Sequence, residues 1–280
     1  MKRPFALTLL LFLFVDVVLS QTRNVYDIYA IEYAKIKNRL PASSVAVGAN
    51  PNDSVSLSYF IWFLNGDNGR RVLVDAGLVP DSLKPLSNLR DYIRPDLALR
   101  QININVADVT DLIITHTHYD HIDGIDLFPK AVIWMQKNDF DYFVGGAWQK
   151  GASHIGLEKK DVLKIIQANL EGRLNLVNGD SIEIIPGILA FIGSKHTWES
   201  QHLLVSSNSD KVLLASDDCW FYYNLDHLLS VPLTFDQAAY VAQLKRMKTQ
   251  VTDPRLIIPG HDALVLSRFP LVAKGVVKIR

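Results

Sequence analysis

A stretch that follows a short apolar run, DLIITHTHYDHIDG at residues 111–124, limits the folds available to this chain more than any other feature. Within six positions it places His116, His118, Asp120 and His121, and the whole chain contains only eight histidines. Imidazole and carboxylate groups are costly to crowd together away from water unless a positive charge lies between them. We therefore expect a site for one or two metal ions at the end of a buried strand.

The spacing of these four residues indicates a strand that ends in a loop. Alternate residues of an extended chain point to the same side, so His116 and His118 can contact the same ion. Asp120 and His121 follow where the chain turns, and they can serve a second ion. A helical zinc motif would instead place two histidines four residues apart on one face, and this stretch lacks that spacing.

Further ligands must come from other parts of the chain, because a catalytic zinc ion usually has three protein ligands and one open position. Three later apolar runs each end in a suitable residue. His196 follows the run around Phe191, Asp217 follows KVLLAS, and His261 follows RLIIPG. This repetition predicts several short buried strands that deliver ligands at their carboxyl ends.

Two neighbours of Asp217 offer alternatives. Asp218 is also acidic, but Asp217 is the first acid after the strand and is preferred as a ligand. Cys219 is the single cysteine of the chain, which excludes an intrachain disulfide, and we interpret it as a small buried residue. The other histidines lack a strand end with acidic neighbours and are interpreted as ordinary core or surface residues: His154, His202 and His227.

Strands and helices alternate irregularly along the rest of the chain. The segment NGDNG between the apolar runs 57–64 and 72–74 predicts a β-hairpin. Residues 138–156 are rich in aromatic residues and glycine, and predict a long loop that is either a lid or a packed hydrophobic cluster. Other strands are expected within residues 24–45, 112–115, 131–136, 174–180, 181–193, 201–208, 211–217 and, as the last strand, 255–262. Helices are expected near 96–103, 158–170 and 233–249, the last with Phe235, Ala238, Ala239, Val241, Ala242 and Leu244 on one side.

Composition and charge narrow the class of protein. Apolar residues make up 49% of the 280 residues and charged residues 21%, which is typical of a globular domain with a substantial core. The formal net charge is zero, which argues against a nucleic acid or an acidic membrane surface as a partner. No segment has linker composition, so we expect one domain of mixed α/β (α+β) class over residues 21–280.

The first twenty residues, MKRPFALTLLLFLFVDVVLS, have two basic residues followed by an apolar run and small residues before Gln21. This pattern predicts a secretory signal peptide at residues 1–20. A membrane anchor is the alternative, but the run is short for a span and contains Asp16. We expect an exported protein, periplasmic or secreted, without stable membrane association after cleavage.

The motifs, taken in their order along the chain, resemble those of the metallo-β-lactamase superfamily. HTHYDH matches its His-x-His-x-Asp-His motif, and the later matches are the histidine of KHTWESQ, the aspartate of LLASD and the histidine of PGHD. The early VLVDAG resembles the strand of the family that ends in an aspartate, here Asp75. The resemblance extends over roughly residues 57–262, and five short motifs in the same order are unlikely to coincide by chance.

The resemblance implies a four-layer αββα sandwich with two divalent metal ions, most simply zinc, at the edge of its sheets. By position, the first ion would be held by His116, His118 and His196, and the second by Asp120, His121 and His261. Asp217 would bridge the two ions. Asp75 would orient the ligands through hydrogen bonds.

The chemistry expected of such a centre is hydrolysis. A metal-bound hydroxide would attack the carbonyl of an ester, lactone or amide, and Asp120 would pass a proton to the leaving group. The closest resemblance is to the N-acyl-homoserine-lactone lactonases, which act on a small molecule. The alternatives are a β-lactamase-like or broad ester and thioester hydrolase, a mono-iron persulfide dioxygenase, and a metal-binding scaffold without activity.

One substrate contact is expected outside the ligand set. In lactonases of the superfamily, a tyrosine shortly after the bridging aspartate reaches the substrate carbonyl. The sequence DDCWFYYNL offers Tyr222 or Tyr223 for this role, although its spacing differs from the usual one. Packing of either ring in the core is the alternative interpretation.

Overall fold

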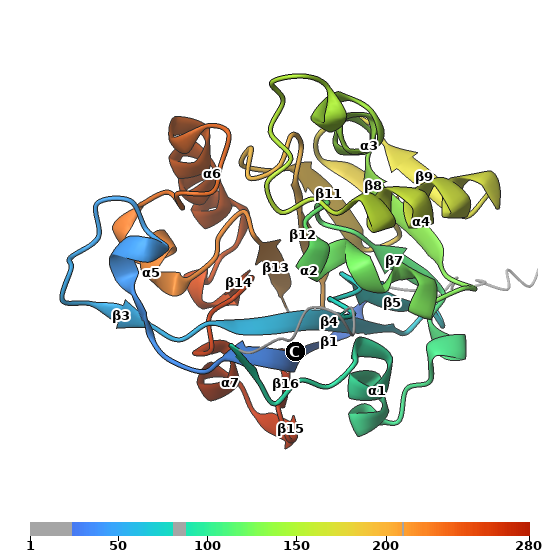
Figure 1. The fold of residues 1–280 in the computed structure, drawn as a ribbon. Helices are drawn as coiled ribbons and strands as arrows, with labels where there is room; N and C mark the ends of the chain where they lie inside the picture. The colour runs from blue at the N-terminus through green and yellow to red at the C-terminus, as the bar shows by residue number, and fades with distance from the viewer. Residues whose placement is uncertain (1–23, 81–87, 209) are drawn as a thin grey trace, which may run out of the picture.

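The computed structural model describes residues 24–80, 88–208 and 210–280, and Figure 1 shows its arrangement. The expected signal peptide, residues 1–20, lies outside the described residues. Two sheets dominate the fold. The larger has the order β15-β16-β1-β4-β5-β7-β8-β9 with β6 beside β1, and the smaller has the order β10-β11-β12-β13-β14.

The strands of the larger sheet are β1 (Tyr26–Ile36), β4 (Ser58–Gly66), β5 (Arg71–Val74), β6 (Leu89–Arg90), β7 (Asp111–Ile113), β8 (Val132–Gln136), β9 (Leu174–Val177), β15 (Leu271–Ala273) and β16 (Val276–Lys278). Those of the smaller sheet are β10 (Ile182–Ile185), β11 (Ile188–Ile192), β12 (Gln201–Ser206), β13 (Lys211–Ser216) and β14 (Ile257–Pro259). A short pair, β2 (Leu40–Pro41) and β3 (Ser54–Val55), lies apart from both.

The helices are α1 (Pro95–Leu99), α2 (Tyr119–Ile122), α3 (Lys137–Val144), α4 (Lys159–Leu170), α5 (Tyr222–His227), α6 (Gln237–Gln250) and α7 (Val265–Arg268). Short 3₁₀ helices occupy Ala42–Ser44, Arg100–Ile102, Val106–Asp108, Asp123–Leu127, Gly146–Trp148 and Pro254–Leu256. Among the described residues, no helix combines the length and the apolar character that crossing a membrane requires.

Alternation along β4 shows how the layers form. Phe60, Trp62 and Leu64 belong to the core between the two sheets, whereas Ile61 and Phe63 belong to the core on the outer face of the larger sheet. Successive side chains of a strand point to opposite faces, so a strand that is apolar throughout must be covered on both sides.

Helices provide the two outer layers. Residues of α1, α3 and α4 pack on the larger sheet, while residues of α5 and α6 pack on the smaller sheet. Figure 1 shows α4 and α6 on opposite sides of the sheets. The expected four-layer αββα arrangement is therefore confirmed.

The hairpin expected around NGDNG is confirmed, because β4 and β5 pair with Asn65 opposite Arg71. The long loop expected at residues 138–156 is wrong for its first half. The helix α3 spans Lys137–Val144, and Phe140 and Phe143, three positions apart, enter the core of the larger sheet. This spacing places both rings on one helical face.

Of the side predicted to be apolar on α6, only Leu244 is buried. Its buried residues are Tyr240, Gln243, Leu244 and Met247, and Phe235 lies before the helix and is exposed. The strand at Ile257–Pro259 is not the last one either, since the β15–β16 pair follows it and joins the larger sheet beside β1.

The topology brings several strand ends to one edge of the sandwich. In the larger sheet β5, β7 and β8 run parallel, and in the smaller sheet β13 and β14 run parallel. Parallel neighbours end at the same edge of a sheet, which is where such folds commonly place ligands. Most of the residues expected to bind metal follow β7, β13 and β14, and His196 follows the antiparallel strand β11.

Candidate metal centre

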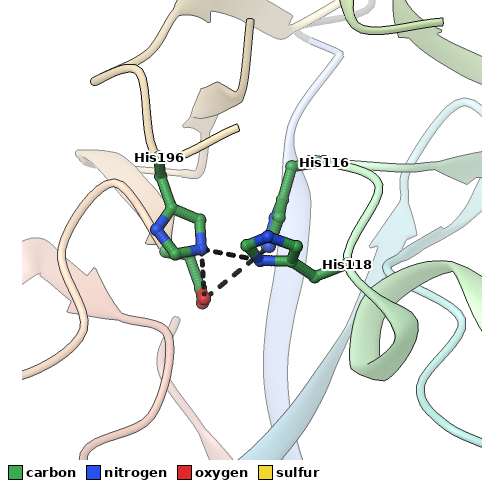
Figure 2. Close-up of side chains that lie close together, drawn as sticks. His116, His118 and His196 are labelled. Carbon is green, nitrogen blue, oxygen red and sulfur yellow. Dashed lines mark hydrogen bonds and ion pairs between the residues drawn. The ribbon is translucent and has the colours of Figure 1, made fainter. Parts of the chain in front are cut away.

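Seven side chains expected as ligands lie together at this edge. One group contains His116, His118, His196 and Asp217, and the other contains Asp120, His121 and His261. Within each group the potential ligand atoms lie within 4.8 Å of one another, and all seven residues are buried. Figure 2 shows the rings of three of them, His116, His118 and His196, turned toward one another.

Local structure around β7 places the first four ligands. The strand ends at Ile113, and the backbone N–H of Thr115 donates to Asp75 at 2.8 Å, which holds the chain extended as it leaves the sheet. The short helix α2 then begins at Tyr119, so that Asp120 and His121 lie in its first turn. The extended segment and the turn therefore point their side chains at two adjacent positions.

The first group is compact. His196 Nε2 lies 2.9 Å from His118 Nδ1 and 3.1 Å from Asp217 Oδ2. His116 Nε2 lies 3.6 Å from the same Asp217 oxygen. The three ring nitrogens therefore surround one carboxylate oxygen, as ligands of a shared ion would.

The second group uses the other oxygen of Asp217. His261 Nε2 lies 3.0 Å from Asp217 Oδ1, and His121 Nε2 lies 3.4 Å from it. Asp120 Oδ2 lies 3.4 Å from His121 Nε2 and 3.6 Å from His261 Nε2. Since each oxygen of Asp217 faces a different group, this carboxylate stands between two positions for an ion.

The second ring nitrogen of four histidines is held by the protein. Nδ1 of His121 contacts Asp75 at 2.8 Å, and Nδ1 of His116 contacts the Thr115 hydroxyl at 3.1 Å. Nδ1 of His196 donates to the Leu233 carbonyl at 2.8 Å, and Nδ1 of His261 donates to the Ser58 carbonyl at 3.0 Å. Such bonds fix the ring orientation and leave Nε2 for a metal. His118 differs, because it presents Nδ1 to the centre.

Several atoms at the centre have no hydrogen-bond partner among the described residues. They are His116 Nε2, His121 Nε2 and Asp217 Oδ1, and all are buried. A buried polar atom without a partner is costly and rare in a folded protein. Lone pairs that converge in this way suit a divalent cation, and five imidazoles with two carboxylates form a donor set typical of zinc.

The electrostatics of the histidines favour the neutral ligand form in the first group. Burial, with the adjacent His196, lowers the pKa of His118 to about 3, and burial, with His121, lowers that of His116 well below its usual value. In the second group burial also opposes charge. There the carboxylates of Asp120, Asp217 and Asp75 outweigh it and raise the pKa of His121 well above its usual value.

Asp75 lies behind the ligands, as its expected orienting role requires. Besides His121 and Thr115, its carboxylate accepts from Ser216 at 3.2 Å, so it joins the ends of β5, β7 and β13. It is fully buried and has a positive φ of 62°. Strained backbone of this kind concentrates at functional sites.

Asp218, the alternative to Asp217, faces away from the centre. Its Oδ1 accepts from the Ser194 N–H at 2.9 Å, and its Oδ2 contacts His202 Nδ1 at 3.3 Å. Asp218 thereby ties the loop that carries His196 to the end of β13. Cys219 is buried, and its thiol contacts the Phe221 carbonyl, outside both ligand groups.

The structure does not bring either expected tyrosine to the pocket at the metal centre. Tyr222 packs in the core between the sheets with its ring 3.5 Å from the Arg268 guanidinium, and the Tyr223 hydroxyl donates to Asp53 at 2.8 Å. Both line a separate cavity of about 290 Å³. The chain enters α5 at Tyr222, and the helix turns both side chains away from Asp217.

A cavity of about 120 Å³ opens on the ligands themselves. It is lined by His118, Asp120, Asp217 and His261 together with residues that the sequence did not single out: Leu57, Tyr59, Tyr119, Gly156, Trp220 and Leu233. Tyr119 lies inside the HTHYDH motif, so its position there was a usable signal. The others come from β4 and from loops, and only the folded chain places them here.

Two of these residues contact ligands directly. The indole N–H of Trp220 donates to Asp217 Oδ2 at 2.7 Å. Gly156, with a positive φ of 76°, lies so close to His118 that a Cβ atom there would be 2.5 Å from the ring. The segment 138–156 therefore reaches the centre at its last residue, whereas its first half is the helix α3.

Comparison with known proteins agrees with this geometry. The family model of the metallo-beta-lactamase superfamily matches residues 51–261. An N-acyl homoserine lactonase of Bacillus cereus is 25% identical over 241 residues, which cover 80% of this chain and 88% of the relative. The N-acyl homoserine lactonase AttM of Rhizobium radiobacter is 28% identical over 172 residues, 60% of this chain and 61% of the relative.

Solved structures share the fold. AiiA of B. thuringiensis, a mutant with N-decanoyl-L-homoserine bound at the active site, superposes with a TM-score of 0.69 at 21% identity, covering 89% of this chain and 98% of that chain. AidC, a dizinc quorum-quenching lactonase, has a TM-score of 0.64 at 15% identity, covering 92% and 98%. Because the family model spans well over half of the sequence, the chain belongs to the metallo-beta-lactamase superfamily of hydrolases.

Proposed function

We propose that the protein opens lactones of the N-acyl-homoserine type and uses two divalent metal ions, most simply zinc. The observation that carries this proposal is the division of seven buried donors into two groups that share Asp217, beside a small pocket. The names of the relatives from Bacillus cereus and Rhizobium radiobacter, both acyl homoserine lactonases, support the substrate class.

The residues of the centre fit two cations better than one. His116, His118 and His196 would hold the first, Asp120, His121 and His261 the second, and Asp217 would bind both. Two divalent cations placed in this way polarise a carbonyl group and lower the pKa of bound water toward neutrality.

Asp120 has a position suited to moving a proton. It lines the pocket, and its contacts with His121 and His261 are made by Oδ2. This leaves Oδ1 free to take a proton from the attacking water and to deliver it to the ring oxygen that departs when the lactone opens. A carboxylate that takes up a proton in this way acts first as a general base and then as a general acid.

The size of the pocket supports a compact reacting group. A cavity of about 120 Å³ accepts a five-membered ring but not a long chain, so the rest of the substrate would extend over the rim. Two exposed aromatic side chains lie within two residues of the ligand His196 and of the pocket residue Leu233 in the sequence, Trp198 and Phe235. Trp198 follows His196 by two residues and stacks on Tyr142 at 4.7 Å, and Phe235 contacts both rings at 5.8 Å. An apolar acyl substituent would bury this surface.

The other candidate functions are supported less well. A β-lactamase-like or broad ester hydrolase would use the same donors and differs only in its substrate. A mono-iron dioxygenase needs a single ion, whereas two groups of donors are present. A metal-binding scaffold without activity would use the same donors, and only the absence of turnover would distinguish it. Zero net charge supports a small neutral substrate over nucleic acid.

Metal analysis combined with a substrate panel tests the proposal. Purified protein should contain about two divalent ions per chain, and should open acyl-homoserine lactones faster than it hydrolyses p-nitrophenyl esters or nitrocefin. One iron per chain would support the dioxygenase. Two bound ions with faster turnover of nitrocefin or of simple esters would replace the lactone assignment by one of the alternatives.

Export is a further part of the proposal and rests on residues 1–20 of the sequence. We expect cleavage before about Gln21 and a mature protein in the periplasm or the medium. Mass spectrometry of the mature N-terminus measures the cleavage site, and a chain that keeps Met1 in the membrane fraction would contradict it.

A further inference from the structure

Two tyrosines from distant parts of the sequence lie on one wall of the metal pocket. Tyr59 belongs to β4, next to Ser58, whose carbonyl holds His261. Tyr119 begins α2, between two ligands of the HTHYDH motif. Both line the cavity of about 120 Å³.

Neighbouring groups hold the ring of Tyr59 and the backbone of Tyr119 in place. The ring of Tyr59 meets that of His261 edge-on at 5.3 Å and that of Tyr33 at 6.0 Å. Tyr33 in turn donates its hydroxyl to the Asp120 carbonyl at 2.9 Å. The backbone N–H of Tyr119 donates to the Gly156 carbonyl at 2.9 Å. Preorganised side chains lose little conformational entropy when they bind a ligand.

The two phenol groups lie close enough together for each to influence the pKa of the other. Among the described residues, neither hydroxyl donates a hydrogen bond to a third residue. Each hydroxyl carries one proton, so at least one O–H of the pair can donate to a molecule in the pocket.

The ordinary pKa of a phenol is about 10, so both hydroxyl groups carry their protons at neutral pH. Neutral phenols donate hydrogen bonds and do not repel the electron-rich oxygen of an ester.

We propose that the Tyr59–Tyr119 hydroxyl pair donates a hydrogen bond to the carbonyl oxygen of the bound ester and so takes the role that the sequence suggested for Tyr222 or Tyr223. The inference rests on the proposed hydrolase function and adds a donor to it. Tyr119 is the half-exposed member of the pair, with 40% of its surface accessible, so its hydroxyl is the one that a substrate can reach. Tyr59 orients it.

A hydrogen-bond donor directed at the carbonyl oxygen stabilises the transition state more than the bound substrate, because the oxygen gains negative charge in the transition state. In an enzyme that stabilises the oxyanion by hydrogen bonds alone, the loss of one donor lowers kcat by about 100- to 1,000-fold. Two cations would carry part of that charge here, so we expect a smaller loss of kcat, with KM little changed. We expect Tyr119→Phe to lower kcat about 10- to 100-fold with KM within about threefold. Tyr59→Phe should lower kcat about three- to tenfold, since the Tyr119 hydroxyl remains.

The two residues should behave as one unit. The double variant Tyr59→Phe/Tyr119→Phe should be no slower than Tyr119→Phe alone, because Tyr59 acts through Tyr119. Tyr92→Phe is the matched control. It removes a partly buried hydroxyl that donates to the Leu78 carbonyl at 3.0 Å outside the pocket, and its kcat should stay within about twofold.

The experiment measures kcat, KM, metal content and melting temperature for the wild type and these variants with an acyl-homoserine lactone. If the wild type turns over and Tyr119→Phe retains its kcat, the inference fails and the proposed function stands. If Tyr222→Phe loses more activity than Tyr119→Phe, the inference also fails. If the metal-loaded wild type hydrolyses no ester or lactone, the proposed function fails and the inference falls with it.

Discussion

The close approach of Gly156 to His118 allows a sharp test of the metal centre. A Cβ atom at residue 156 would lie 2.5 Å from His118 Cδ2 and 2.9 Å from its Nε2. Carbon atoms in contact are normally about 3.5 Å or more apart, so in Gly156→Ala the ring or the loop must shift by about 1 Å. Metal ligands tolerate only about 0.2 Å of displacement, and we expect the first ion to bind at least about 10- to 100-fold more weakly.

Gly151→Ala provides a control in the same segment. Residue 151 has a positive φ of 82°, close to the 76° of residue 156, but a Cβ atom there would meet nothing within 4 Å. Both variants carry the cost of an alanine in the left-handed region, about 1 kcal/mol. Only Gly156→Ala adds the displacement of a ligand, so the difference between the two variants isolates it.

Zinc affinity is measured by competition with a chromophoric chelator, and the stability of the metal-free proteins is measured by thermal unfolding. Both variants should unfold at reduced temperatures, Gly156→Ala at least as much as Gly151→Ala because of its contact with the ring. Gly156→Ala alone should retain about one ion at chelator concentrations that leave two in the wild type. Equal zinc affinity in Gly156→Ala and the wild type would refute the contact between this loop and a ligand. An equal loss in Gly151→Ala would show that the loop acts through its backbone instead.

Other predictions concern the ligands and a buried acid that does not line the pocket. His118→Ala should abolish turnover, by more than about 100-fold, and leave the far-ultraviolet circular dichroism unchanged; normal turnover would remove His118 from the site. Asp217→Ala should lose both ions in metal analysis, because its two oxygens face different groups, whereas loss of one ion would contradict bridging. Chelation of the wild type should stop hydrolysis and lower the melting temperature, and added zinc should restore both. Burial, with the charge of Asp123, raises the pKa of Asp161 to about 7. The folded state then binds more protons than the unfolded state between about pH 4 and 7, so this group lowers stability as pH rises through that window, by at most about 1.4 kcal/mol per unit. The melting temperature of Asp161→Asn, relative to that of the wild type, should therefore be higher at pH 8 than at pH 5. An equal difference between the two proteins at both pH values would contradict this.

The ligand set was predictable because each ligand directly follows an apolar strand. A run such as KVLLAS cannot remain exposed, so Asp217 must emerge where the run leaves the core. Parallel pairing of β13 with β14, and of β5 with β7, then brings these ends together. Spacing and hydropathy carry this information within a few residues, and no long-range contact has to be known in advance.

Other features depend on contacts that a local pattern does not encode. The alanines of α6 offer little area to bury, and the helix instead packs through Tyr240, Leu244 and Met247. It also buries Gln243, whose amide contacts His202 at 3.2 Å. A polar residue that is buried because of a distant partner looks solvent-exposed in any helical projection of the sequence.

The residues that line the pocket are the clearest example of positions that local sequence patterns do not predict. The metal ligands of the HTHYDH motif and those later in the chain could be assigned from the order of the motifs alone. The hydroxyl groups near these ligands could not. Tyr222 follows Asp217 closely in the sequence, yet α5 carries it into the core between the sheets. Tyr59 is more than 150 positions before Asp217, yet the pairing of β1 with β4 and the hydrogen bond from His261 to the Ser58 carbonyl bring it to the ligands. Proximity along the chain is therefore a poor guide to substrate contacts in this fold, because the strands supply the metal ligands at their ends while residues beside those ends complete the pocket.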